Sequence, residues 1–478
     1  MESFGHVIAG EEVPSIDGAT FPSVDPWEQA PWSTVALGSV PDAERAVDAA
    51  RKAFDDGPWA RMSLAERGQV LHRLADLILA NADELALADT TDMGKPISET
   101  RGHDVQRSAQ NFRFFADHST VTPAESYPMP SGHHAYTQYE PAGVVAAIAP
   151  WNFPLMMASW KVAPALAWGN TVVLKPAEQS PASATILARL ALEAGLPPGV
   201  LNVVHGFGPR SVGQALTESP LVDRITFTGE STTGRAISRA AALNLTPVSL
   251  ELGGKGANIV FDDADLEQAV SWSIKAIYSN SGQVCLAGSR LYVQRGIFDE
   301  FLERFTRAAD QLVIGDPKRD GTQIGPLSSE EHFRKVSGYL DIAVADGARL
   351  HTGGVGGGWT VRPTVVIGAE QHARITQEEV FGPVVVILPF DDEPAAIAAA
   401  NDTPYGLNAM LFTRDLSRAH RVSRALRVGT VWTNCFFVRD LRAPFGGAKN
   451  SGVGREGGTY SREFFTEPKA IVMEIANA

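Results

Sequence analysis

The sequence predicts an α/β protein with two separate parallel sheets, and three observations support this class. Between residues 144 and 250, short apolar runs alternate with amphipathic stretches, which is the pattern of parallel strands joined by crossover helices. A second alternating set extends from about residue 257 to residue 431. The chain has 478 residues, 44% of them hydrophobic, so it is globular and too long for a single ordinary core. We therefore expect a doubly wound, Rossmann-like domain followed by a second α/β domain.

Helices are expected before the first strand of this pattern. Apolar residues recur at helical spacing between Pro41 and Asn81, which predicts two amphipathic helices, and a third is expected over Arg101 to Asp117. The third helix carries Arg107 and Arg113, which are about 240° apart around the helix axis. The two arginines therefore cannot face the same site.

The strands and helices of the two sheets follow in order. A segment at 123–139, rich in proline, serine, histidine and tyrosine, ends like an edge strand or hairpin. Expected strands are 144–148, 171–174, 201–204, 224–227 and 248–250, separated by helices at 156–168, 182–194, 211–217 and 233–243. The second set begins with a strand at 257–260 and contains a glycine-rich surface loop at 353–358. The last apolar strand, 470–475, is expected to pair with a distant hairpin or a neighbouring subunit.

Composition excludes several classes of function. The net charge is −14 and no block of lysine or arginine occurs, which argues against binding to nucleic acid or to an anionic membrane and favours small molecules. The N-terminus does not resemble a secretory signal, and no apolar run approaches the roughly 20 residues that span a bilayer. Two cysteines are too few for a disulfide framework, which is consistent with a reducing cytoplasm. Histidines and cysteines show no metal-ligand spacing, so no metal is expected.

Cys285 is the first candidate for chemistry because it lies in a loop of small residues that includes Gly282 and Gly288. A nucleophilic thiol needs access and nearby backbone N–H groups, and this setting favours both. Considered alone, however, a free cysteine is more often a buried structural residue.

Further candidates lie where predicted strands end, the edge at which open α/β sheets bind ligands. Asn152, between two prolines, carries an amide N–H that can stabilise an oxyanion. Glu251 has apolar neighbours that should raise its pKa, as a general base requires, although a structural ion pair with Lys255 is the alternative. Lys175 and Glu178 offer a cation and a carboxylate that could hold ribose hydroxyls, or they form an ordinary charged turn.

A turn with two glycines, Gly229 and Gly234, lies between a predicted strand and a helix. Such a turn lets the backbone approach a pyrophosphate at the helix N-terminus. It lacks the G-x-G-x-x-G spacing, so a simple tight turn is equally compatible with the sequence.

Taken in order, these residues, together with the motifs at 379–383 and 444–447, resemble the NAD(P)-dependent aldehyde dehydrogenase superfamily over essentially the whole chain. The segments Leu-Glu-Leu-Gly-Gly-Lys and Gly-Gln-Val-Cys at this separation are highly specific to that family. The resemblance implies that Cys285 is the nucleophile, that Glu251 activates the deacylating water, and that Asn152 and the Cys285 backbone N–H bind the oxyanion. It implies a set of cofactor contacts: Trp151, Lys175, Glu178, Gly208, Phe227, Gly229, Glu230, Gly234, Leu252, Glu379 and Phe381.

The implied cofactor is NAD, because Glu178 can accept both ribose hydroxyls but would repel a 2′-phosphate, although the nearby Lys175 leaves some room for NADP. Glu230 departs from the family, many members of which have serine beside the pyrophosphate. A carboxylate facing a phosphate is unfavourable, so we expect Glu230 to point away or the cofactor to shift. The Gly-Glu-Ser pattern and residues 434–445 nevertheless resemble the subgroup that oxidises 2-hydroxymuconate-type semialdehydes.

Such a substrate carries carboxylates, which a tunnel would bind through a cation, preferably a bidentate arginine. Arg439 and Arg442 precede Phe445, in a segment that lines the substrate tunnel in the family, and Arg442 is the preferred candidate. Arg107 is preferred on the early helix, and Phe153 is a further expected substrate contact. A surface or interface salt bridge is the alternative for each arginine.

Two other functions remain open. A broad-specificity or betaine-type aldehyde dehydrogenase would use Trp432, Phe436 and Phe437 as an apolar or cation-holding tunnel. A non-catalytic or coenzyme A-acylating relative is disfavoured because Asn152 and Glu251 accompany the cysteine.

The resemblance also implies a domain division and an assembly. Residues 1–118 and 142–253 form the expected NAD-binding domain, 254–453 the catalytic domain, and 119–141 with 454–478 a small β oligomerisation element. This element implies a homodimer or homotetramer.

Overall fold

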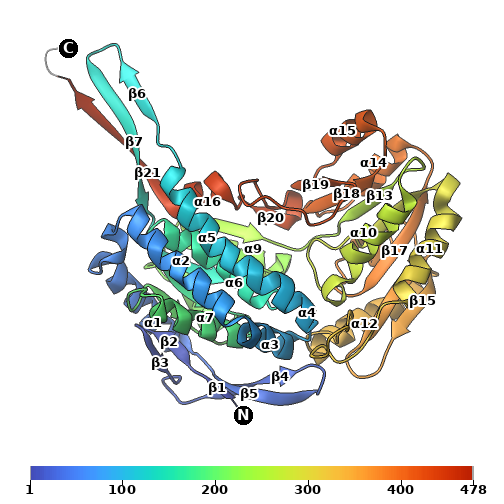
Figure 1. Cartoon of the computed structure of the whole chain (residues 1–478), viewed down its shortest axis with the longest axis horizontal. Coiled ribbons are helices and arrows are strands. Elements are labelled where there is room, and N and C mark those ends of the chain that lie inside the picture. Colours follow the sequence, from blue (N-terminus) through green and yellow to red (C-terminus); the bar gives the residue numbers. More distant parts are fainter. Residues whose placement is uncertain (1, 476–478) are drawn as a thin grey trace.

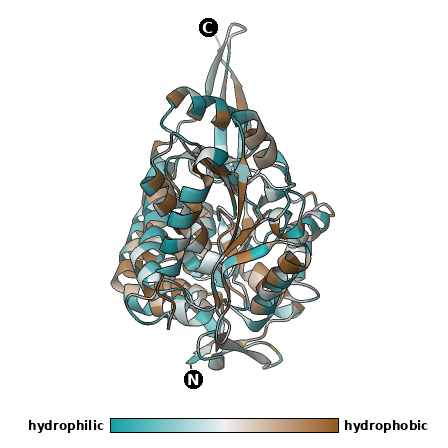
Figure 2. Ribbon diagram, turned by 90° about the vertical axis from the view of Figure 1, so that its right-hand side faces the viewer, coloured by the Kyte–Doolittle hydropathy of each residue, from teal (hydrophilic) through white to brown (hydrophobic). Residues whose placement is uncertain are grey.

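The computed structural model describes residues 2–475 and has two α/β lobes, with a small sheet projecting from one of them (Figure 1). The expected α/β class with Rossmann-like parallel sheets is confirmed. Within these residues no helix is long and apolar enough to cross a membrane. In Figure 2 the apolar residues concentrate on the central strands and on the inner faces of the helices, where the hydrophobic clusters lie.

The sheet of the first lobe has the strand order β20-β12-β11-β8-β9-β10-β2-β3. Its five central strands are parallel and are β8 (Val144–Ile148), β9 (Thr171–Lys175), β10 (Leu201–Val203), β11 (Arg224–Thr228) and β12 (Val248–Glu251). The connecting helices are α6 (Pro154–Ala167), α7 (Ala182–Glu193), α8 (Val212–Glu218) and α9 (Ser231–Ala241). From β8 the chain builds outward to β9 and β10 on one side and later to β11 and β12 on the other. The gap between β8 and β11 is therefore the topological switch point, where open α/β sheets bind ligands.

The N-terminal strands were not anticipated from the sequence. They are β1 (Glu2–Phe4), β2 (His6–Ile8), β3 (Glu11–Val13), β4 (Thr20–Asp25) and β5 (Ala30–Ala36). Strand β2 extends the main sheet by pairing antiparallel with β10, whereas β1, β5 and β4 form a separate three-stranded sheet. Strands β1, β2 and β3 have three residues each and are too short to display an alternating pattern, whereas β4 and β5 are longer and pair with each other.

The helices that cover the first lobe begin where local signals predict. Helix α1 (Val40–Asp55) has proline in its first turn, and α2 (Leu64–Ala80) starts with a capping box between Ser63 and Glu66. They are followed by α3 (Ala82–Met93), α4 (Ile97–Glu99) and α5 (Gln106–Val121). The third predicted helix begins differently from the expectation, because Thr100–Val105 forms a π-helical turn that leads into α5.

The sheet of the second lobe has the order β15-β16-β17-β14-β13-β18-β19. Its strands are β13 (Ala257–Val260), β14 (Arg290–Gln294), β15 (Arg349–Val355), β16 (Val361–Ile367), β17 (Val384–Phe390), β18 (Asn408–Phe412) and β19 (Thr430–Thr433). The helices are α10 (Leu266–Tyr278), α11 (Phe298–Asp310), α12 (Glu330–Ala345), α13 (Arg374–Gln377), α14 (Glu393–Asn401) and α15 (Leu416–Ala425). The predicted glycine loop is partly wrong, because Gly353 and Gly354 lie in β15, whose pairing with β16 shifts register there.

The projecting sheet combines β6 (Ser126–Met129), β7 (His133–Pro141) and the terminal strand β21 (Thr466–Glu474). β21 pairs antiparallel with β7 along its whole length, so the expected pairing with a distant hairpin is confirmed. Two short elements before it return to the first lobe across the predicted boundary at 453/454. Strand β20 (Gly452–Val453) pairs with β12, and α16 (Gly458–Phe465) packs on α5 and α6.

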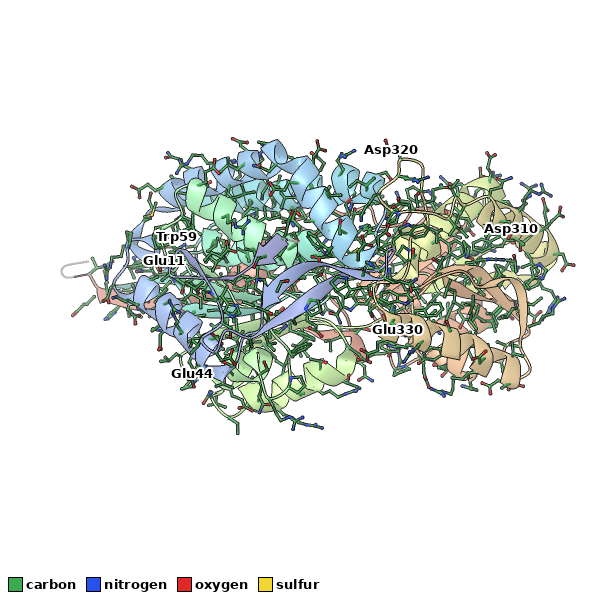
Figure 3. The ribbon with its side chains drawn as sticks, turned by 90° about the horizontal axis from the view of Figure 1, so that it is seen from below. Glu11, Glu44, Trp59, Asp310, Asp320 and Glu330 are labelled. Carbon is green, nitrogen blue, oxygen red and sulfur yellow. The ribbon has the colours of Figure 1, made fainter. Side chains whose placement is uncertain are left out.

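The surface carries the acidic excess of the chain. In Figure 3 the labelled residues Glu11, Glu44, Asp310 and Glu330 lie on the outside of the two lobes, and all four are exposed. Trp59, labelled in the same view, is buried against the first core. Acidic side chains on the outside and apolar residues within agree with the globular class predicted from composition.

Candidate active site

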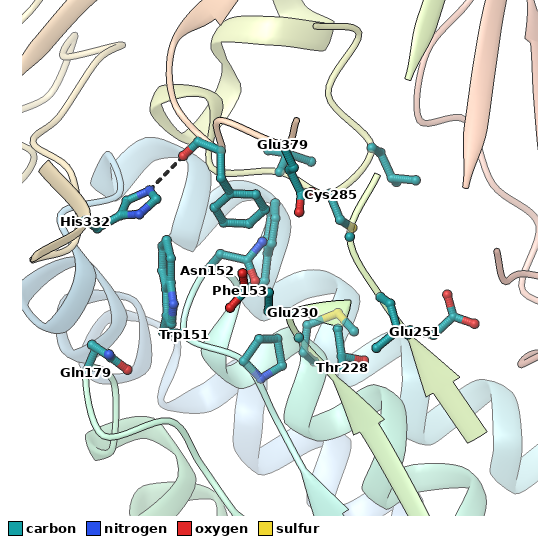
Figure 4. Close-up of a pocket in the computed structure, with 18 of the residues that line it drawn as sticks. Trp151, Asn152, Phe153, Gln179, Thr228, Glu230, Glu251, Cys285, His332 and Glu379 are labelled. Atoms are coloured by element: carbon teal, nitrogen blue, oxygen red, sulfur yellow. Dashed lines mark hydrogen bonds between the residues drawn. The ribbon is translucent and has the colours of Figure 1, made fainter. Parts of the chain in front are cut away.

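A cavity of about 380 Å³ is lined by loops of both lobes (Figure 4). The first lobe contributes the residues that follow β8, β9, β11 and β12, and the second contributes the segments around 285, 332, 380 and 440. In this view Cys285 and Glu251 lie toward one side of the cavity, and Trp151 and His332 toward the other. The cavity therefore includes the switch point of the first sheet.

The loop before Cys285 is held in an unusual backbone conformation. Asn280 and Ser281 have φ values of 48° and 52°, in the left-handed region that non-glycine residues rarely adopt. The Asn280 amide donates to the Asn152 carbonyl at 2.8 Å, and the Asn152 amide donates to the Gln283 carbonyl at 2.9 Å. These reciprocal bonds fix Asn152 beside the cysteine loop. They use one N–H of the Asn152 amide and leave the second N–H available to a ligand.

Cys285 is less open than its small neighbours suggested. The side chain is half-buried and packs against the core of the second lobe. Burial, followed by the carboxylates of Glu379 and Glu251, raises the pKa of the Cys285 thiol to about 12. The backbone N–H groups of Cys285 and Leu286 act in the opposite direction on this pKa. In the protein without ligands the thiol is therefore protonated at neutral pH, with backbone donors next to its sulfur.

Glu251 ends β12 and is 3% exposed. Neither carboxylate oxygen has a hydrogen-bond partner among the described residues. Burial raises the pKa of Glu251 well above its usual range, and the neighbouring Glu456 carboxylate raises it further. The raised pKa agrees with the expectation from its apolar neighbours. The alternative, an ion pair with Lys255, is not present in residues 2–475, where the pKa of Lys255 is itself lowered by burial to about 7.

Sequence reasoning missed Glu456. Its carboxylate accepts hydrogen bonds from the Trp160 indole at 2.5 Å and from the hydroxyls of Thr226 and Ser249 at 3.3 Å, and it lies 3.4 Å from the Lys161 ammonium. The available signal was a charged residue flanked by glycines 454, 457 and 458.

Only some of the predicted cofactor contacts line the cavity. Those that do are Trp151, Glu178, Gly229, Glu230, Leu252, Glu379 and Phe381. Lys175, Gly208, Phe227 and Gly234 do not. Lys175 is buried, its ammonium donates to the Pro176 carbonyl at 2.8 Å, and it lies 3.9 Å from the Glu178 carboxylate. Gly208 lies in the loop between β10 and α8.

The two glycines of the turn after β11 have packing reasons of their own. A Cβ atom at Gly229 would lie 2.4 Å from the Phe227 ring, and one at Gly234 would lie 2.6 Å from Leu252. Close packing thus explains why both positions are occupied by glycine. It also explains why Phe227 is buried beneath the turn.

Glu230 does not point away from the site, contrary to one of the two expected outcomes. It is exposed, lines the cavity and makes no side-chain capping bond at the start of α9. Its charge contributes to raising the pKa of Glu379, which burial brings to about 7. The cavity therefore contains several carboxylates on its cofactor side.

Trp151 belongs to an aromatic group that sequence reasoning did not foresee. Its ring contacts His332 and Phe381 edge-on, with centroids 5.1 Å and 5.3 Å apart, and His332 Nε2 is 2.7 Å from the Phe381 carbonyl. Phe381 has a φ of 61°. His332 is a single histidine in α12, so no local pattern distinguishes it from a surface residue.

Arg439, rather than Arg442, is the arginine that faces the cavity. Its guanidinium carbon lies 4.1 Å from the centroid of the Trp160 ring and 3.9 Å from that of Phe445. Its Nε and Nη2 are shielded from solvent and have no hydrogen-bond partner in the described chain. Burial lowers the pKa of Arg439 to about 10, so it remains protonated at neutral pH. Phe153 and Phe445 also line the cavity, as expected.

The preference for Arg442 is wrong. Its side chain is 74% exposed, forms an ion pair with Asp440 and lies outside the cavity. Arg107 does not line the cavity either, although it is half-buried and close enough to lower the pKa of Arg439. Arg113, on the other side of α5, pairs with Asp76 on the surface.

Comparisons with known proteins cover nearly the whole chain. The sequence model described as "Aldehyde dehydrogenase family" matches residues 13–471. The chain is 47% identical to 2-hydroxymuconic semialdehyde dehydrogenase of Pseudomonas sp. (strain CF600), over 99% of this chain and 100% of that protein. It is 44% identical to 2-aminomuconic 6-semialdehyde dehydrogenase of Pseudomonas sp., over 99% of each. A crystal structure of indole-3-acetaldehyde dehydrogenase in complex with NAD+ superposes with a TM-score of 0.97 at 43% identity, covering 99% of this chain and 97% of the other.

Proposed function

The chain belongs to the aldehyde dehydrogenase family, and from this membership we propose that it oxidises a semialdehyde carrying a carboxylate to the corresponding acid, with NAD as the hydride acceptor. The proposal that the substrate has a carboxylate rests on the surroundings of Arg439. A protonated guanidinium lies between two aromatic rings at the cavity with two N–H groups unpartnered. Such a group is costly unless a ligand completes its hydrogen bonds, and a carboxylate matches its geometry.

The residues present fit NAD at the switch point between β8 and β11. Trp151 follows β8, Glu178 follows β9 and Gly229 follows β11, and all three line the cavity. In this proposal the Glu178 carboxylate accepts the ribose hydroxyls. Glu178 and Glu230 together disfavour the additional phosphate of NADP by charge repulsion. The chemistry that bound NAD supplies is acceptance of the hydride from the substrate carbon.

The roles proposed for the chain follow from the positions of three residues. The Cys285 thiol transfers its proton to solvent water and its sulfur adds to the aldehyde carbon, so that the carbonyl oxygen becomes an oxyanion. The free N–H of Asn152 and the Cys285 backbone N–H donate to this oxygen. Loss of hydride leaves a thioester on Cys285. Glu251 then takes a proton from water, which attacks the thioester, and the C–S bond breaks to release the acid and the thiolate.

The raised pKa of Glu251 supports its proposed role as a base. A carboxylate without hydrogen bonds, beside a second carboxylate, holds a proton more strongly than an exposed one. It is therefore a better proton acceptor near neutral pH than an ordinary glutamate.

The cavity argues against a betaine-type substrate. Arg439 would repel a quaternary ammonium, and Trp432 and Phe436 are buried in the core of the second lobe rather than lining the cavity. Of the three aromatic residues considered for a cation-holding tunnel, only Phe437 lines it.

The test compares two aldehydes of equal length in the wild-type protein, 2-hydroxymuconate 6-semialdehyde and a neutral dienal, with NAD. We expect kcat/KM from NADH absorbance to be at least tenfold higher for the carboxylated aldehyde. Equal values would refute the carboxylate assignment. NADH formation that survives Cys285→Ala would refute the thioester route.

We also propose that the chain forms a homodimer or homotetramer through the projecting sheet. Its two outer strands are β6 and β21, and among residues 2–475 no strand pairs with their outer edges. Tyr127, Met129, Val472 and Met473 on these strands are exposed. Analytical ultracentrifugation should give twice or four times the 51.1 kDa mass of the chain.

A further inference from the structure

Asp104 lies in the π-helical turn before α5 and contacts two basic side chains at once. Its Oδ2 is 2.5 Å from the Lys95 ammonium, and its Oδ1 is 2.8 Å from His103 Nδ1. The side chains of Asp104 and Lys95 are 0% and 1% exposed, whereas that of His103 is 44% exposed. π-Helical turns are rare and occur mainly at functional sites. The proposed chemistry assigns none of these three residues a role.

Each of these two side chains, Lys95 and His103, contacts one aromatic wall of the cavity. The Lys95 ammonium lies 3.8 Å from the centroid of the Phe153 ring, a cation–π contact. The His103 ring lies 5.7 Å from that of Phe437. Phe153 and Phe437 both line the cavity. Phe153 belongs to the first lobe and Phe437 to the second, so Asp104 connects the two walls.

The wall formed by Phe437 needs external support. Phe437 has a φ of 59°, and Asn434, three residues earlier, has a φ of 57°. Left-handed conformations of non-glycine residues persist only where surrounding contacts hold them. The ring of His103 is one such contact, and Asp104 orients that ring through its hydrogen bond.

Stability alone does not explain the buried pair of Lys95 and Asp104. Removing two charges from water is costly, and apolar residues of similar volume often stabilise a fold as well or better. Buried pairs of this kind are best attested where they specify one arrangement of their surroundings. Here the surroundings are the two aromatic walls.

We propose that Asp104, with Lys95 and His103, is a positioning unit that sets the gap between Phe153 and Phe437 and thereby selects aldehydes by their width. In this proposal an aromatic aldehyde contacts both walls, whereas acetaldehyde is too small to do so. This inference rests on the proposed assignment of the cavity to the aldehyde, but not on recognition of a carboxylate.

The first test separates the two contacts of His103. His103→Phe keeps a ring against Phe437 but loses the hydrogen bond to Asp104, and His103→Asn keeps a donor but loses the ring. We expect both variants to misplace the Phe437 ring and so to raise the KM for benzaldehyde about fivefold, the magnitude of one aromatic pair between Phe437 and the substrate, with kcat for acetaldehyde unchanged. A His103→Phe variant with wild-type KM for benzaldehyde would overturn the role of Asp104.

A matched control is His72, whose Nε2 is 2.8 Å from Asp117 and whose side chain is 41% exposed. The histidine–aspartate distance and the exposure of the histidine match those of His103, although Asp117 is exposed where Asp104 is buried, and His72 does not line the cavity. His72→Phe and His72→Asn should leave both substrates unaffected. A benzaldehyde effect as large as that of the His103 variants would show a nonspecific cause and overturn the proposal.

The second test addresses the buried pair with a neutral replacement, Lys95→Gln combined with Asp104→Asn. Asp104→Asn alone leaves the buried Lys95 ammonium with only the Glu99 carboxylate, 3.9 Å away, and is expected to lower Tm, whereas the double variant should recover it. We expect the higher KM for benzaldehyde to persist in the double variant although Tm returns. If KM returns to the wild-type value together with Tm, the pair is only structural and the proposal fails. Failure of the proposed function itself would differ, because the wild-type protein would then form no NADH with 2-hydroxymuconate 6-semialdehyde, benzaldehyde or acetaldehyde.

Discussion

Replacing Arg439 with methionine tests the substrate proposal most directly. Methionine retains an apolar stem between the Trp160 and Phe445 rings but removes the guanidinium. The matched control is Arg442→Met, three residues away, where the side chain is 74% exposed and paired with Asp440. Both variants remove one positive charge from the same loop. Only the first removes a cation that faces the cavity.

The expected magnitude follows from the environment of the guanidinium. Removing one partner of a buried, hydrogen-bonded charge pair costs about 2–5 kcal/mol of binding free energy. The Nε and Nη2 of Arg439 are covered from solvent, so we expect its loss to cost about 3 kcal/mol of binding free energy. This cost corresponds to a decrease of roughly 140-fold in kcat/KM for a carboxylated aldehyde. Exposed ion pairs such as that of Arg442 contribute less than about 1 kcal/mol, so its variant should lose at most fivefold.

The assay uses the ratio of kcat/KM for 2-hydroxymuconate 6-semialdehyde to that for a neutral dienal. The ratio matters because the charge of Arg439 also lowers the pKa of Glu251. Its removal therefore changes the proposed base for every substrate, and this effect cancels in the ratio. An unchanged ratio in Arg439→Met, or an equal decrease in Arg442→Met, would refute the reasoning.

Three further predictions concern the proposed base, the thiol and the cofactor. Glu251→Gln should lower steady-state turnover by about 10²- to 10⁴-fold, as expected for loss of a general base. The variant should still form about one NADH per subunit in a rapid-quench burst, because hydride loss precedes the step that needs the base. Absence of the burst would show that Glu251 acts before hydride loss. Because burial raises the pKa of the Cys285 thiol to about 12, its thiolate fraction should increase with pH throughout the range below that value. Alkylation of Cys285 by iodoacetamide in the protein without cofactor, located by mass spectrometry, should therefore accelerate about tenfold per pH unit from pH 7 to pH 9, and a plateau in this range would contradict the raised pKa. Glu178→Gln removes a carboxylate that would repel the additional phosphate of NADP. Relief of a repulsion of roughly 1.4 kcal/mol should increase the ratio of kcat/KM with NADP to kcat/KM with NAD by about tenfold. An unchanged ratio would exclude Glu178 from cofactor selection.

Much of the fold and the main reactive residues were predictable from local sequence. The strands from β8 to β13 are short apolar runs, and the helices between them repeat apolar residues every three or four positions, so each can be recognised within a few residues. Asn152 lies in the loop after β8 and Glu251 is the last residue of β12, and the carboxyl ends of parallel strands meet at one edge of the sheet. Their convergence with Cys285 in one cavity was therefore accessible from order and spacing.

The tertiary structure alone decided which side chains complete the site. Arg439 and Arg442 lie in an irregular loop without periodicity, and contacts with Trp160 and Phe445 direct one inward while Asp440 holds the other outside. The same holds for Glu456 beside Glu251 and for Asp104 in its π-helical turn. Periodicity encodes the regular elements because their hydrogen bonds and faces repeat locally. The orientation of a side chain in a loop, and the pKa of a buried group, depend instead on residues that are distant in sequence and become neighbours only on folding.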